Sequence, residues 1–168
     1  MTTIIDAIKM CEDKIKIYQN DTKNIEIAIG KKPEFVIINA SNDEGNARYI
    51  KGKIKEGEKA GLKVEVVKLE EHCNNEDVLN IINRCNEEKI PVILQLPTFK
   101  HLDTKKLMES INYDVDADGF AREWIGEINL GNDKSTNVVL PNRYKNSHLN
   151  RQIYRCELFY LCSCLSTQ

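Results

Sequence analysis

The sequence lacks both an excess of charge of one sign and a hydrophobic run long enough to cross a bilayer. Its 24 lysines and arginines nearly balance 26 aspartates and glutamates, which leaves a net charge of −2. A chain with so little net charge has no general attraction to nucleic acid or to an anionic lipid surface. The longest apolar stretch, Leu158 to Leu165, is too short for a transmembrane helix. We therefore expect no nucleic-acid partner and no membrane association.

A secretory signal is also missing from the start of the chain. The segment Met1 to Met10 carries Asp6 within an amphipathic pattern and has no small-residue cleavage site. In the absence of such a signal, the six cysteines are expected to be reduced thiols. These features predict a cytoplasmic protein.

The sequence offers little to a metal ion or a nucleotide. Its three histidines are isolated from one another, with no partner at metal-ligand spacing. Cys162 and Cys164 lie near Cys156, but nothing close in sequence completes a tetrahedral site. No Gly-x-Gly-x-x-Gly turn or comparable phosphate loop occurs. We expect no metal, and we find no nucleotide-binding motif in this chain.

Three short apolar runs have the pattern of buried strands. They lie at Phe35–Ile38, Val64–Leu69 and Val92–Leu96. A continuous apolar run of this length, bounded by polar or turn residues, is typical of a strand that is covered on both faces.

Helical patterns alternate with these strands. Strand, helix, strand, helix, strand is the signature of a parallel sheet with right-handed crossovers. The sequence therefore predicts an α/β fold, a three-layer parallel sheet with helices on both faces. Four helices are expected. The first is capped by Thr2 or Thr3 and ends near Asn20-Asp21, and the second runs to Ala60 and is ended by Gly61. The third is capped by Asn74 or Asn75, and the fourth lies at Thr104–Ile111.

Parallel sheets bind their ligands beyond the carboxyl ends of the strands, which directs attention to the helix after residues 39–45. On that helix Tyr49 and Lys53 are four residues apart and share a face. Lys53 falls on the shoulder of the apolar stripe, where partial loss of water favours a neutral amine. The alternative is an ordinary solvated lysine, and the spacing alone does not separate Lys53 from Lys51 or Lys55.

Two further segments at the same predicted edge carry polar groups. Gln95 ends the third strand, and its amide is able to accept a hydrogen bond from an amine. An ordinary polar strand end is the alternative. Asp116 and Asp118 precede Gly119, either as two acids for a ligand or as a turn capped by its own side chains.

Taken together, three segments resemble a known family. They are Tyr49–Lys53, Val92–Pro97 and Asp116–Phe120. In this order they resemble the N-terminal folate-binding domain of methylenetetrahydrofolate dehydrogenase/cyclohydrolase, whose pattern has a Tyr-x-x-x-Lys helix, a Gln-Leu-Pro strand end and an Asp-Val-Asp-Gly-Phe turn. The resemblance runs from about Ile5 to Leu140.

The resemblance implies an enzyme that oxidises methylenetetrahydrofolate with NADP and hydrolyses the methenyl product to formyltetrahydrofolate. Tyr49 would then stack on the aminobenzoyl ring of a tetrahydrofolate derivative. Lys53 would move protons while water adds to the methenyl carbon, and Gln95 would orient it. Asp118 would accept hydrogen bonds from the pterin.

Several positions depart from the family pattern. Asn46 stands where the family usually has Ser, and Ser41 where it has Gly. Thr98-Phe99 replaces Leu-Pro, and Val115 replaces a lysine. These changes touch the expected pocket wall, and they favour an alternative in which the chain is a non-catalytic folate-binding or interaction domain.

The last part of the chain departs further. We expect a folate-binding domain at residues 1–141 and an atypical tail at 142–168, where the family continues into an NADP-binding Rossmann domain. Our hypothesis is a slip of reading frame near Pro141, which would make the chain an impaired enzyme or an inactive remnant. Family members usually form dimers through the second domain, so a monomer or weak oligomer is expected.

Overall fold

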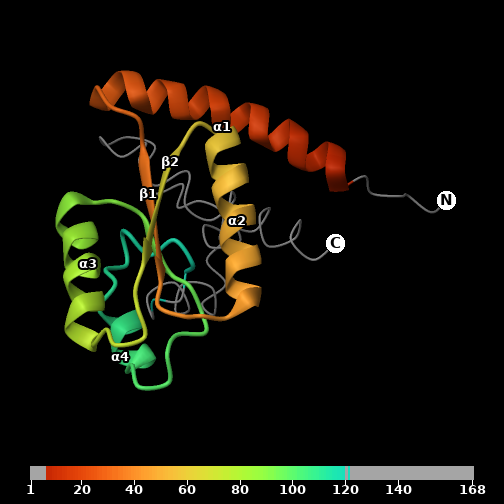
Figure 1. Cartoon of the computed structure of the whole chain (residues 1–168). Coiled ribbons are helices and arrows are strands. Elements are labelled where there is room, and N and C mark those ends of the chain that lie inside the picture. The colour runs from red at the N-terminus through yellow and green to blue at the C-terminus, as the bar shows by residue number, and fades with distance from the viewer. Residues whose placement is uncertain (1–6, 120, 122–168) are drawn as a thin grey trace, which may run out of the picture.

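The computed structural model describes residues 7–119 and 121, which form a parallel sheet with helices on both faces (Figure 1). The predicted α/β fold is confirmed. The expected cap at Thr2 or Thr3, Phe120 and residues 122–168, with the expected domain boundary at 141, lie outside the described residues. The described elements are α1 (Ala7–Ile29), β1 (Glu34–Asn39), α2 (Glu44–Lys59), β2 (Lys63–Lys68), α3 (Asn75–Glu88), β3 (Val92–Leu94) and α4 (Thr104–Glu109).

The sheet has the strand order β2-β1-β3, and both pairings are parallel. β1 is central: Phe35 is level with Val64 of β2, and Ile38 is level with Leu94 of β3. A parallel bridge between Val92 and Asp116 continues the sheet beyond β3. The carboxyl ends of all these segments therefore meet at one edge.

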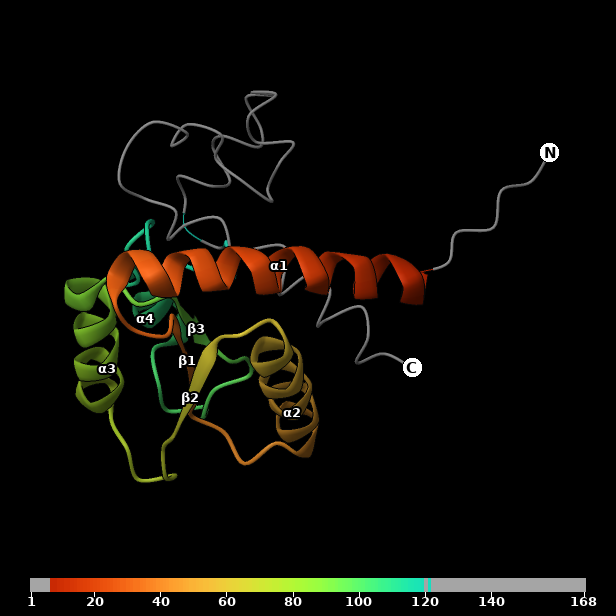
Figure 2. The same cartoon turned by 90° about the horizontal axis from the view of Figure 1, so that it is seen from above.

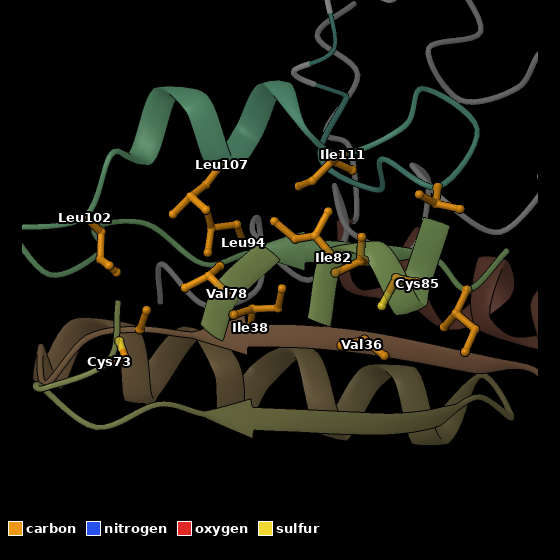
Figure 3. Packing of buried hydrophobic residues seen from close by; sticks show 14 residues of the cluster. Val36, Ile38, Cys73, Val78, Ile82, Cys85, Leu94, Leu102, Leu107 and Ile111 are labelled. Carbon is orange, nitrogen blue, oxygen red and sulfur yellow. The ribbon is translucent and has the colours of Figure 1, made fainter. Parts of the chain in front are cut away.

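Side chains alternate between the two faces of the sheet. Val36 and Ile38 of β1 point into a cluster with α3 and α4, of which Figure 3 draws fourteen residues, including Ile82 and Leu107. Ile37 lies on the opposite face, in a second cluster to which α1 and α2 contribute. Figure 2 shows α2 and α3 on opposite sides of the strands. The expected three layers are present.

The caps of the helices follow the sequence closely. Asp43 caps α2 by accepting the Asn46 backbone N–H at 2.9 Å. Asn74 caps α3 in a reciprocal box with Asp77, as the pattern predicted. Gly61, with φ of 92°, follows the end of α2, where a left-handed residue is favoured.

The predicted end of the first helix is wrong, because α1 continues past Asn20-Asp21 to Ile29 and is followed by Gly30 with φ of 70°. Thr22, 2% exposed, explains the extension. Its Oγ1 lies 2.6 Å from the Tyr18 carbonyl oxygen and 2.7 Å from that of Ala60, after α2. These contacts outweigh the weak helix propensity of Asn and Asp.

Four other elements end slightly earlier than expected: β2 ends at Lys68 rather than Leu69 and α2 at Lys59 rather than Ala60. β3 stops at Leu94, although the Gln95 backbone N–H still donates to the Ile38 carbonyl at 2.9 Å. α4 ends at Glu109 rather than Ile111. Over the described part of the chain, no helix combines the length and apolar character that crossing a membrane requires.

Replacing Thr22 by Val should lower the free energy of unfolding by about 1–2 kcal/mol, because it removes the buried hydroxyl whose hydrogen is shared between the Tyr18 carbonyl of α1 and the Ala60 carbonyl that follows α2. Urea denaturation measures this change. Thr22→Ser is the matched control, since it keeps the hydroxyl and should retain most of the stability. Equal losses in both variants would contradict this account.

Candidate functional site

Lys53 and Gln95 meet between α2 and the end of β3. The Lys53 Nζ donates to the Gln95 Oε1 at 3.1 Å. Lys53 is half-buried, whereas Lys51 and Lys55 on the same helix are exposed. The structure thus separates one lysine from its neighbours, which the spacing alone did not. An amine in this position has one fixed acceptor and limited access to water.

The Gln95 side chain is 9% exposed and is held from both ends. Its Nε2 donates to the Leu96 carbonyl oxygen at 3.0 Å, while its Oε1 accepts from Lys53. The amide therefore presents its oxygen, not its nitrogen, to the ammonium or amine group.

The two acids of the Asp-Ala-Asp-Gly turn occupy different positions. The Asp116 carboxylate is buried and accepts the backbone N–H groups of Asp118 at 3.1 Å, Gly119 at 3.0 Å and Ala121 at 2.7 Å. Gly119 has φ of 73°, which suits glycine at this point of the turn. Asp116 builds the turn, and Asp118 is exposed on it.

Lys53 and Asp118 are close enough to influence each other electrostatically. Burial by the surrounding protein raises the pKa of the Asp118 carboxyl above its usual value; the positive charge of Lys53 opposes this effect, and Asp116 adds to it. Asp118 is nonetheless exposed as a residue, so solvent screens the shift.

Tyr49 lies one turn before Lys53 on α2, with 39% of its surface exposed. An exposed ring one turn from Lys53 presents an aromatic face for stacking. A narrow pocket runs between β3, Met108, Ile111 and the two acids of the turn. The four residues singled out in the sequence thus come from three segments, α2, the end of β3 and the turn.

The sequence did not reveal how Asn46 contributes to the site. Its side chain is 2% exposed, and its Nδ2 donates to the Pro97 carbonyl oxygen at 3.0 Å. This bond ties the first turn of α2 to the segment after Gln95. Nearby, Phe99 stacks on His101 with ring centroids 5.8 Å apart. In the sequence, the only signal for Asn46 was an amide side chain at the start of a polar helix. Its burial is seen only in the structure.

Among residues 7–119 and 121, no group of three or more His, Cys, Asp and Glu side chains is placed to hold a metal ion. Cys11, Cys73 and Cys85 are buried. Burial raises the pKa of the Cys73 and Cys85 thiols, which disfavours the reactive thiolate. Cys156, Cys162 and Cys164 lie outside the described residues.

A family model, "Tetrahydrofolate dehydrogenase/cyclohydrolase, catalytic domain", matches residues 5–118, which is more than half of the chain. This chain belongs to that family. The resemblance drawn from the sequence is confirmed. Members of this tetrahydrofolate dehydrogenase/cyclohydrolase family act in folate one-carbon metabolism.

Curated relatives have the same family character. The chain is 28% identical to the bifunctional protein FolD of Listeria innocua over 137 residues, which cover 79% of this chain and 47% of the relative. It is 33% identical to FolD of Staphylococcus aureus (strain bovine RF122 / ET3-1) over 127 residues, which cover 74% and 44%. The chain thus spans less than half the length of either relative.

Solved structures agree on the fold. The FolD enzyme of Campylobacter jejuni matches with a TM-score of 0.71 and 25% identity, over 77% of this chain and 46% of that one. The Trypanosoma brucei FolD, complexed with NADP cofactor and inhibitor, matches with a TM-score of 0.68 and 22% identity, over 76% and 44%. The matched part is again less than half of each solved chain.

Replacing Asp118 by Asn should raise the free energy of unfolding at neutral pH. Folding disfavours the ionised form of a carboxyl whose pKa is raised in the folded state. The carboxyl of Asp118 therefore lowers the free energy of unfolding increasingly as pH rises from the unfolded pKa of about 3.9 through the folded pKa. The gain in the free energy of unfolding of Asp118→Asn should therefore vanish at pH values below both the folded and the unfolded pKa. Thermal melts over a pH series measure it.

Asp13→Asn is the matched control for this experiment, because Asp13 lies exposed on α1 and the substitution removes one carboxyl without changing the turn. If Asp118→Asn were less stable than the unmodified chain at neutral pH, the attraction of Lys53 would outweigh the burial of the carboxyl.

Proposed function

We propose that this chain is the folate-binding and hydrolytic part of a methenyltetrahydrofolate cyclohydrolase, formed by residues 1–141. Tetrahydrofolate derivatives are the expected ligands. The observation that carries the proposal is the hydrogen bond from Lys53 to Gln95 at 3.1 Å, beside the carboxyl of Asp118. It supplies a tethered amine at the edge of the sheet where ligands of parallel sheets bind.

Lys53 would act as the proton-transfer group of the hydrolysis. The methenyl substrate is cationic, so an ammonium would repel it and a neutral amine would not. The neutral amine takes a proton from water as the oxygen forms a bond to the methenyl carbon. The same proton then passes to the ring nitrogen as its bond to that carbon breaks, while the hydroxyl on the carbon releases its own proton to solvent and becomes the formyl oxygen. Lys53 ends as it began, a neutral amine.

Tyr49 and Asp118 would hold the substrate on either side of this chemistry. The exposed ring of Tyr49 offers an aromatic face to the aminobenzoyl group. Asp118 would accept two hydrogen bonds from the amino and ring N–H groups of the pterin, a planar pair of donors that suits a carboxylate. Gln95 keeps the lysine directed toward the carbon between them.

The oxidation of methylenetetrahydrofolate needs a nicotinamide cofactor, which in this family is NADP or NAD. The sequence has no Gly-x-Gly-x-x-Gly turn to hold its phosphates. We therefore assign hydride transfer only to a protein that also carries a nucleotide-binding domain, and no step of it to residues of this chain. We place the protein in the cytoplasm, as a monomer or weak oligomer.

The competing proposal is a folate-binding module without turnover. The replacement of the family's Ser by Asn46 favours it, because the Asn46 side chain is committed to the Pro97 carbonyl. The Thr98-Phe99 substitution also changes the wall after Gln95. A remnant with neither binding nor turnover is the third possibility.

Replacing Lys53 by Ala should lower methenyltetrahydrofolate hydrolysis by about 100-fold or more, because general-base catalysis contributes about that factor. The loss of the methenyl absorbance measures the rate. Lys51→Ala, on the exposed face of the same helix, should keep the full rate. Folate binding without turnover in the unmodified chain would support the folate-binding module. A chain that shows neither folate binding nor turnover would be the remnant.

Replacing Tyr49 by Ala should weaken binding of a tetrahydrofolate derivative by about 3- to 10-fold, since stacking on an aromatic ring contributes about 0.5–1.5 kcal/mol. Tyr49→Phe keeps the ring and should bind as the unmodified chain does. Calorimetric titration compares the three. An equal loss in Tyr49→Phe would show that the hydroxyl, not the ring face, makes the contact.

A further inference from the structure

Asn39 is a buried amide at the carboxyl end of β1. It is 8% exposed. Because Ile37 and Asn39 are two residues apart in one strand, their side chains point to the same face, the one covered by α2. A polar residue therefore ends this apolar strand beneath the helix that carries Lys53.

Asn39 and Gln95 are neighbours across the sheet. Ile38 is level with Leu94, and the Gln95 backbone N–H donates to the Ile38 carbonyl oxygen at 2.9 Å. One residue further along, Asn39 ends β1 and Gln95 follows the end of β3, which places the two near each other just beyond the last pair of strands spaced about 4.8 Å apart. Leu94 points to the α3 face, so Gln95 points to the α2 face with Asn39.

The side-chain oxygen of Asn39 is buried and accepts no hydrogen bond from the described part of the chain. An unpaired buried acceptor is unfavourable, and such groups usually have a functional or structural explanation. Gln95 has a donor to offer. Its Nε2 carries two hydrogens, of which one reaches the Leu96 carbonyl, while its Oε1 is used by Lys53.

We propose that Asn39 is a positioning residue for Lys53, which acts by setting the orientation of the Gln95 amide. Its oxygen attracts the Gln95 Nε2 and repels the Oε1. With the amide reversed, Oε1 would face the Asn39 oxygen and Nε2 would face the Lys53 amine, two contacts between like partial charges. Asn39 thereby keeps an acceptor in front of Lys53. Its importance for catalysis rests on the function proposed above.

The reactivity of the Lys53 amine tests this without folate and without turnover. A small acylating reagent labels only neutral amines, and peptide mass spectrometry reports Lys53, Lys51 and Lys55 separately over a series of pH values. The midpoint of each profile reports the protonation of that amine, and the plateau reports its access to the reagent. Asp118, whose charge acts with Lys53, and Asp116, whose charge acts on Asp118, stay unchanged in every variant.

Asn39→Leu removes the side-chain oxygen of Asn39 and replaces it with an apolar side chain of similar volume. It should move the Lys53 midpoint to lower pH, with about fivefold faster labelling below the midpoint, because the lysine loses the fixed acceptor that stabilises its charged form. Gln95→Leu should give the same shift, and the double variant no more than either alone. Asn39→Asp keeps an acceptor and adds negative charge, so it should move the midpoint to higher pH.

Thr22→Val is the control for general loss of stability, because it weakens the fold away from Lys53 and should leave the midpoint in place. The proposal is overturned if Asn39→Leu folds and keeps the Lys53 midpoint while Gln95→Leu shifts it, or if the two shifts add. If Asn39→Leu fails to fold, an unchanged midpoint in Asn39→Asp overturns it. Absence of hydrolysis in the unmodified chain would refute the proposed function and leave this result standing.

Discussion

The hydrogen bond between Lys53 and Gln95 joins two parts of the fold that the chain approaches separately. Lys53 is carried by α2, which packs on one face of the sheet, and Gln95 follows β3 at its carboxyl edge. A long lysine side chain is flexible in solution, so a fixed acceptor is required to hold its amine in one place. The packing of α2 on the sheet, through Ile50 and its neighbours, sets the distance between the two residues.

The edge around this bond is built largely from amides rather than ions. Asn46 ties the start of α2 to Pro97, and Asn39 ends β1, next to the strand that Gln95 follows. Neutral amides fix direction without adding charge, which matters for an amine whose proposed role requires it to lose its proton. A carboxylate in the place of Gln95 would favour the ammonium.

The two acids of the turn have different surroundings. Asp116 uses its carboxylate on three backbone N–H groups and holds the loop closed. Asp118 is left at the surface of the turn with a carboxyl that folding disfavours when ionised. Side chains that lower the stability of the folded protein are common at binding sites, because the ligand supplies the partners that these side chains lack in the free protein.

Local sequence determined the alternation of strands and helices along the chain, the capping residues Asp43 and Asn74, and the motifs of the family pattern. Each of these depends on near neighbours in the chain. Tertiary structure decided which lysine meets Gln95, 42 residues away, since three lysines share the same local pattern. It also decided that α1 continues through Thr22, whose partner Ala60 is 38 residues distant. Periodicity carries no information about contacts at such separations, and they form only when the sheet brings the segments together.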